Sequence, residues 1–176
     1  QIEQSGADAL ELNIFILPSD LTRSAAENEQ NYFNIVSEVR KQVSLPVIVK
    51  LSAYFSDLAG FLQRISASGI QGLVLFNRFY NPDFDTETLE FTSGAVLSSP
   101  TDFYNSLRWI GIMAGRAQCD LAASTGVHDG QALIKQLLAG AHAVEIASTL
   151  YKNGNSRLPE MLDELGGWMT RHGYDS

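Results

Sequence analysis

The sequence predicts an α/β fold built on parallel strands, and three observations carry that prediction. Residues 5–12, 68–75 and 139–146 share one pattern, in which a glycine follows an apolar-periodic stretch and precedes an apolar run. Glycine is the usual left-handed stop after a helix, and the run that follows it is typical of a buried strand. Two further apolar runs, at 46–51 and 120–124, indicate two more strands, and helical periodicity fills the intervals.

Strands therefore alternate with helices along the whole chain. The strands are expected near 9–13, 46–52, 72–77, 120–124 and 143–148, and the helices at 25–43, 56–67, 101–115, 129–139 and 157–172. Such alternation implies parallel strands joined by right-handed crossovers, and strands that are apolar nearly throughout are typical of a sheet covered by helices.

Two architectures fit this order: a doubly wound open sheet, or part of a (β/α)₈ TIM barrel. Five units with polar residues at the strand ends favour the second half of a barrel. A complete barrel usually takes about 250 residues, so we expect residues 1–176 to be the C-terminal part of one domain with three units upstream. The isolated chain would then expose strand edges and associate or be poorly stable.

One segment, residues 78–100, interrupts the alternation of strands and helices. Residues 88–92 alternate as a strand does, and Ser93-Gly94 is a turn signal. We therefore expect a small β-hairpin inserted around 84–98. Long loops that follow barrel strands usually shape the active site.

Composition limits the classes of protein and partner. Among 176 residues, 45% are apolar and 18% charged, which suffices for a core and excludes a disordered chain. The net charge of −8 argues against nucleic-acid binding, and no apolar run approaches the roughly 20 residues of a membrane helix. The single cysteine, Cys119, excludes a disulfide framework and suits a reducing cytoplasm, which is the expected location.

The chemistry should lie where the strands end. The fourth strand runs into Ser124-Thr125-Gly126 and the fifth into Ala147-Ser148. Backbone N–H groups in such loops form anion sites, and the last two loops of a barrel are the common phosphate site. Either loop alone could equally be a tight turn with a hydroxyl cap. Their occurrence on consecutive strands favours phosphate.

Three polar residues end the other strands. Lys50 could offer its charge to an electron-rich ligand, or could extend past the strand end to water. Asn13 and Asn77 can donate and accept hydrogen bonds, which suits a flat heterocycle, or could cap turns. The histidines show no metal-ligand spacing, so no metal site is expected.

In their order and spacing, Val47-Ile48-Val49-Lys50-Leu51, Asn77, Ser124-Thr125-Gly126, Ile146-Ala147-Ser148 and Gly173-Tyr174-Asp175-Ser176 resemble the C-terminal part of dihydroorotate dehydrogenases. These are FMN-dependent (β/α)₈ barrels of pyrimidine biosynthesis, and the resemblance spans nearly the whole chain. It implies that Lys50 contacts the flavin ring and that Asn13 and Asn77 face flavin and substrate. By the same resemblance the FMN site comprises Lys50, Asn77, Gly94, Ser98, Ser124, Thr125, Gly126, Ala147 and Ser148.

The sequence departs from the family in its substrate half. The family places a Cys or Ser base after the first strand, but here that position falls on Ile16 or Leu17, neither of which can take a proton. Ser19 is the only nearby hydroxyl and a weak substitute. Arg78 replaces a family serine. It could bind an anionic substrate group, or fold back onto Asp83 or Asp85.

We therefore expect an FMN-dependent oxidoreductase that transfers hydride between a small, anionic substrate and the flavin, acting as a homodimer without nucleic-acid or membrane partners. Two alternatives stay open. One is a phosphate-binding barrel isomerase or synthase that uses no flavin, and the other is a non-catalytic flavin or metabolite binder.

Overall fold

The computed structural model describes residues 2–176 and contains one five-stranded parallel sheet. Its strands lie in the order β1 (Leu10–Asn13), β2 (Val47–Leu51), β3 (Gly72–Leu75), β6 (Asp120–Ser124) and β7 (Ala143–Glu145). The order in space is thus the order along the chain. In a doubly wound sheet the order reverses at a switch point, so this arrangement selects the barrel type of winding over the open sheet.

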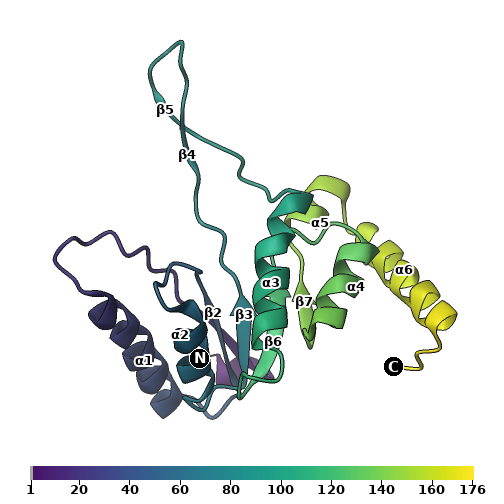
Figure 1. Cartoon of the computed structure of the whole chain (residues 1–176), viewed down its shortest axis with the longest axis horizontal. Helices are drawn as coiled ribbons and strands as arrows, with labels where there is room; N and C mark the ends of the chain where they lie inside the picture. The colour runs from purple at the N-terminus through teal and green to yellow at the C-terminus, as the bar shows by residue number, and fades with distance from the viewer. Residues whose placement is uncertain (1) are drawn as a thin grey trace.

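Helices follow the strands and gather outside the sheet (Figure 1). They are α1 (Ala25–Gln42), α2 (Leu58–Ser66), α3 (Phe103–Met113), α4 (Gly130–Ala139), α5 (Ser148–Asn153) and α6 (Arg157–His172), with 3₁₀ turns η1 (Glu3–Ser5) and η2 (Pro100–Asp102). The five predicted helices are confirmed, with ends that differ by at most two residues. The short α5 is an addition that the periodicity did not predict.

The two faces of the sheet differ in polarity. On β2, Val47, Val49 and Leu51 are buried against the helices, whereas Ile48 and Lys50 on the other face are only half-buried. Lys50 Nζ lies 2.5 Å from Glu145 Oε2 on β7. Because β3 and β6 separate these strands, a flat sheet would hold them about 14 Å apart. The contact shows that the sheet curves toward its polar face, as a barrel wall does.

The main core lies between the sheet and the first three helices. Phe61 of α2 is fully buried and stacks on Phe55 with ring centroids 3.9 Å apart. Tyr32 of α1 meets the edge of the same ring at 5.4 Å. Leu73 and Leu75 of β3 complete the contact from the sheet, with no exposed surface.

The predicted hairpin exists, but its turn is elsewhere. Strands β4 (Pro82–Phe84) and β5 (Phe91–Ser93) pair antiparallel and project away from the sheet (Figure 1). The carboxylate of Asp85 accepts hydrogen bonds from the N–H groups of Glu87 and Thr88, which fixes the turn there. The strand expected at 88–92 is therefore confirmed only at Phe91 and Thr92, and the turn expected at Ser93-Gly94 was wrong.

Two strands end two or three residues earlier than the sequence predicts: β3 at Leu75 instead of 77, and β7 at Glu145 instead of 148. Strand β7 ends at Glu145, so Ala147 lies in a loop and Ser148 begins α5. The three repeated glycines, Gly6, Gly69 and Gly140, have φ of +82°, +83° and +110°, which confirms the left-handed stop predicted for each.

Within residues 2–176, no helix has the length and apolar character needed to cross a membrane.

Phe61→Ala should test this core directly. The substitution removes a ring with no exposed surface and three aromatic neighbours, so we expect the free energy of unfolding to fall by about 3–5 kcal/mol. Phe61→Leu, which keeps most of the apolar volume, should cost less. Urea denaturation of both variants measures the difference, and a loss below about 1 kcal/mol for Phe61→Ala would contradict this packing.

Candidate anion-binding site at the strand ends

The loops after β6 and β7 enclose a cavity of about 160 Å³ at the C-terminal ends of the strands. We call it the loop cavity. Residues 124–127 and 145–148 line it, together with Arg78, Val96 and Ser98. It brings together Arg78, predicted for the substrate, and six of the nine residues predicted for FMN: Ser98, Ser124, Thr125, Gly126, Ala147 and Ser148.

In the part of the chain that the structure describes, three of the residues that line this cavity have free backbone N–H groups. Thr125 and Gly126 both have left-handed backbones, with φ of +78° and +80°. Within residues 2–176, the N–H groups of Thr125, Gly126 and Ala147 donate to no protein acceptor. A Cβ on Gly126 would lie 2.2 Å from the backbone nitrogen of Phe103, so only glycine fits there. Successive free N–H groups in such a loop are the donors that an anion requires.

A hydrogen-bonded network ties a third loop to the cavity. The N–H of Ser98 donates to Ser148 Oγ at 2.9 Å, and Ser98 Oγ lies 3.0 Å from His128 Nε2. The ammonium of Lys152 donates to the Ser98 carbonyl at 2.6 Å. Sequence reasoning missed the roles of His128 and Lys152, because these contacts join residues 30 and 54 positions apart.

A charged cluster lies on the concave face beside the cavity. Lys50 Nζ lies 2.5 Å from Glu145 and 3.5 Å from Glu11. Burial, reinforced by the neighbouring Glu145, raises the pKa of Glu11 above its ordinary value. Burial acts the same way on Glu145, but hydrogen bonds from Glu11 and Lys50 outweigh it and hold the pKa of Glu145 below its ordinary value. Glu145 is therefore ionised, and it also lines the loop cavity.

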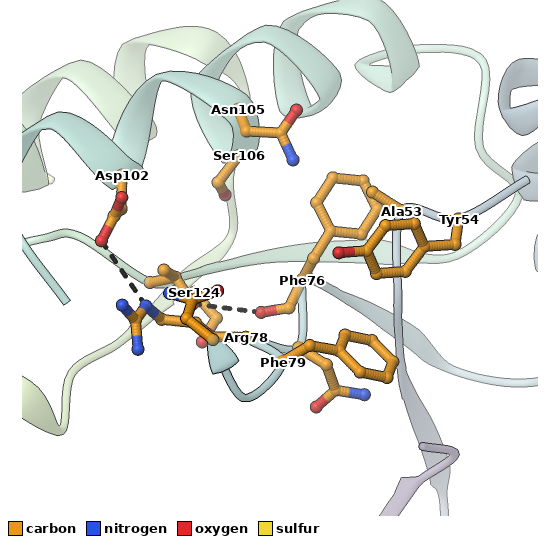
Figure 2. A pocket seen from close by; sticks show the side chains of 12 residues that line it. Ala53, Tyr54, Phe76, Arg78, Phe79, Asp102, Asn105, Ser106 and Ser124 are labelled. Atoms are coloured by element: carbon orange, nitrogen blue, oxygen red, sulfur yellow. Dashed lines mark hydrogen bonds and ion pairs between the residues drawn. The ribbon is translucent and has the colours of Figure 1, made fainter. Parts of the chain in front are cut away.

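A second cavity, of about 320 Å³, adjoins the first, because Arg78, Ser124 and Thr125 line both. Figure 2 shows the aromatic rings of Tyr54, Phe76 and Phe79 among its walls. Its remaining lining residues are mostly polar and include Asn77, Asn81, Asp102 and Asn105. We call it the aromatic cavity.

The aromatic residues that line it come from two segments: Phe76 and Phe79 follow β3, and Tyr54 follows β2. Phe79 stacks on Phe15 at 4.1 Å, and Tyr54 meets Phe79 edge-on at 5.0 Å. Tyr80 lies apart from them and stacks on Phe91 of the hairpin. Phe76 belongs to the main core, whereas Phe79 and Tyr80 pack against aromatic rings of other segments.

Arg78 does not fold back onto the hairpin acids. Its two terminal nitrogens donate to the carbonyls of Val96 and Ala95, each at 2.7 Å, and its Nε lies 3.6 Å from Asp102 (Figure 2 shows this last pair). The expected alternative pairing with Asp83 or Asp85 was wrong. The guanidinium instead fixes the segment that leads from the hairpin to Ser98.

The other predicted residues lie around the two cavities. Asn13 is exposed and in register with Lys50, while Asn77 Nδ2 donates to the Ile14 carbonyl at 3.3 Å. Gly94 lies at the base of the hairpin, where its N–H donates to Asn81 at 2.8 Å. Ser19 is exposed and lines neither cavity.

The segment expected to carry a base is apolar in its packing as well as in its sequence. Ile16 packs against the main core, and Leu17 is 54% exposed. Within residues 2–176, no group of three or more His, Cys, Asp or Glu side chains could hold a metal ion.

A sequence model of the family described as dihydroorotate dehydrogenase matches residues 1–169. The chain belongs to the dihydroorotate dehydrogenase family. The catalytic subunit of dihydroorotate dehydrogenase B (NAD(+)) from Bacillus pumilus is 28% identical over 183 aligned residues, covering 100% of this chain and 58% of the relative. The same subunit from Pyrococcus abyssi is 26% identical, covering 97% and 58%.

A solved dihydroorotate dehydrogenase shares the fold. The enzyme from Eimeria tenella, crystallised with ferulenol, superposes with a TM-score of 0.68 at 19% identity, covering 96% of this chain and 52% of that one. The chain thus spans little more than half the length of these dihydroorotate dehydrogenases, which agrees with five units of an eight-unit barrel.

The network at Ser98 predicts a pH-dependent stability. Burial lowers the pKa of His128 below its ordinary value of 6.5, and the Lys152 charge adds to the effect. The unfolded chain then takes up the proton more readily, so this contribution to stability is complete above pH 6.5 and is lost as pH falls from 6.5 through the lower folded-state pKa. Urea denaturation between about pH 7.5 and 5.5 should show a steeper loss for the wild type than for His128→Gln. Parallel curves would contradict the assignment.

Proposed function

We propose that the protein is an FMN-dependent oxidoreductase of the dihydroorotate dehydrogenase type, with the FMN phosphate in the loop cavity. The observation that carries this proposal is the donor set there: the unpaired N–H groups of Thr125, Gly126 and Ala147 at the ends of the last two strands. Membership of a family known for FMN supports the identity of the ligand.

The residues present suit FMN in charge and shape. The left-handed loop at Thr125 and Gly126 offers donors without side chains in the way, and Ser98 and Ser148 add hydroxyl groups to the cavity lining. One acidic group, Glu145, faces the same space, but the ammonium of Lys50 lies 2.5 Å from its carboxylate and offsets its charge. Bound FMN would supply the hydride acceptor.

The aromatic cavity is the proposed substrate side. Its rings can cover a flat molecule, and the amides of Asn77, Asn81 and Asn105 can pair with ring N–H and C=O groups. Arg78 lines both cavities, although its guanidinium already has three partners. We propose that it acts on an anionic substrate mainly through its charge. The homodimer suggested by the resemblance remains part of this proposal.

Two other functions make different predictions. A phosphate-binding isomerase would bind a sugar phosphate in the loop cavity and show no flavin spectrum. A non-catalytic flavin binder would hold FMN, but no dihydropyrimidine would bleach it. Visible spectra of the full-length protein separate the first from our proposal, and anaerobic reduction by a panel of dihydropyrimidines separates the second.

Ala147→Asp should test the phosphate position. Ala147 is exposed and lines the loop cavity, so the change adds a carboxylate to the cavity lining. We expect FMN affinity of the full-length protein to fall at least about tenfold, because like charges meet in a partly enclosed site. Fluorescence titration with FMN measures it.

Ala147→Asn is the control, since it adds the same volume without the charge and should bind FMN nearly as the wild type does. Equal affinities in the Asp and Asn variants would overturn the assignment. Gly126→Asp is a poorer test, because any side chain at Gly126 collides with the start of α3.

Dihydroorotate itself should be oxidised slowly. Removing hydride requires removing a proton too, and a positioned base typically contributes roughly 10²–10⁴-fold. Ile16 and Leu17 supply no base, so we expect anaerobic flavin bleaching by dihydroorotate to be slower than in an enzyme with a base by about that factor. If exposed Ser19 substitutes in part, Ser19→Ala slows bleaching further. Rapid bleaching in both the wild type and Ser19→Ala would show that this loop is not where the proton is lost.

A further inference from the structure

Glu145 is an unexpected group in a cavity for an anion. It is the last residue of β7, and its side chain is 31% exposed. It lines the same cavity as Thr125, Gly126 and Ala147, whose N–H groups are free within residues 2–176. A carboxylate in that position repels a phosphate. In a partly buried site such a repulsion is stronger than in bulk water, because screening is weaker.

Lys50 is placed to offset this repulsion. Its ammonium reaches across the concave face from β2 and lies 2.5 Å from Glu145, whereas Glu11 is farther at 3.5 Å. Lys50 itself does not line the loop cavity. Its effect on an anion there therefore passes through the carboxylate that it neutralises.

We propose that Glu145 and Lys50 form a charge pair that limits the affinity of the loop cavity for a phosphate. Glu145 is the specificity-determining residue, and Lys50 is its counter-charge. This rests on the proposed function, since it concerns the cavity assigned to the FMN phosphate. It gives Lys50 a role that contact with the flavin ring alone does not require: within residues 2–176, no other cation lies within ion-pair distance of Glu145.

Substitutions of the two residues of this charge pair should change the affinity for phosphate in opposite directions. Glu145→Gln removes the repulsive charge and keeps the side-chain volume, so affinity for phosphate should rise about tenfold. Lys50→Met leaves the carboxylate uncompensated, so affinity should fall by a similar factor. In Lys50→Met/Glu145→Gln neither charge remains, and affinity should return to within about threefold of the wild type, which is the non-additivity expected of a coupled pair.

The test is a double-mutant cycle on the full-length protein, with calorimetric titration of FMN, riboflavin and inorganic phosphate. Riboflavin lacks the phosphate, so its affinity should stay within about twofold of the wild type in Glu145→Gln. Glu38→Gln, which removes an exposed carboxylate paired with Lys41 on α1, is the matched control for net charge and should change none of the affinities.

The outcomes separate the two claims. If the wild type binds neither FMN nor phosphate, the proposed function is wrong, and so is the role proposed for the charge pair. If FMN binds to the wild type but Glu145→Gln does not raise the affinity for FMN, only the role proposed for the charge pair is wrong. If Lys50→Met lowers the affinity for riboflavin as much as that for FMN, and adding Glu145→Gln does not restore binding, Lys50 acts on the flavin ring. The role proposed for the charge pair is then likewise wrong. Thermal unfolding of the ligand-free variants shows whether each is folded.

Discussion

The curvature of the parallel sheet is the constraint on which the rest of the structure depends. The strands are added in chain order, so the helices lie outside and the polar face turns inward. The pair of Lys50 on β2 and Glu145 on β7 spans that inward face and exists only because the sheet curves. The same curvature brings the loops after β6 and β7 next to the segment around Ser98, and this convergence makes the loop cavity.

The chemistry of the cavity comes from backbone as much as from side chains. Positive φ values at Thr125 and Gly126 expose N–H groups, and close contact with the start of α3 holds that conformation. Helix α4 begins only at Gly130, with Asp129 as its cap, so its N-terminus contributes less than a helix starting directly at the loop would. In our proposal, anion binding therefore relies on the loop donors and on the balance of charge between Lys50 and Glu145.

The sequence predicted the strands, and it predicted the strand-end residues that the structure gathers around the loop cavity, because both depend on local signals. A left-handed glycine followed by an apolar run is local, and so is a hydroxyl-rich strand end. The hairpin turn was misplaced because the side chain of Asp85, rather than the alternation at 88–92, decides where the chain reverses. The six-residue α5 is too short to show a helical period.

Contacts between distant segments had no local signal. Arg78 meets the carbonyls of Ala95 and Val96 because its segment and theirs are the two arms leading to and from the hairpin. Lys50 and Glu145 are 95 residues apart and meet only once the sheet is wound. Sequence reasoning could name Lys50 as unusual at a strand end, but its partner follows from the order of the strands.

The most direct measurement of the central claim is a crystal structure of the full-length protein with FMN. We expect a phosphate within about 3 Å of the N–H groups of Thr125, Gly126 and Ala147, between the loops after β6 and β7. FMN bound with its phosphate elsewhere, or a loop cavity filled by protein side chains in the complete barrel, would contradict this expectation.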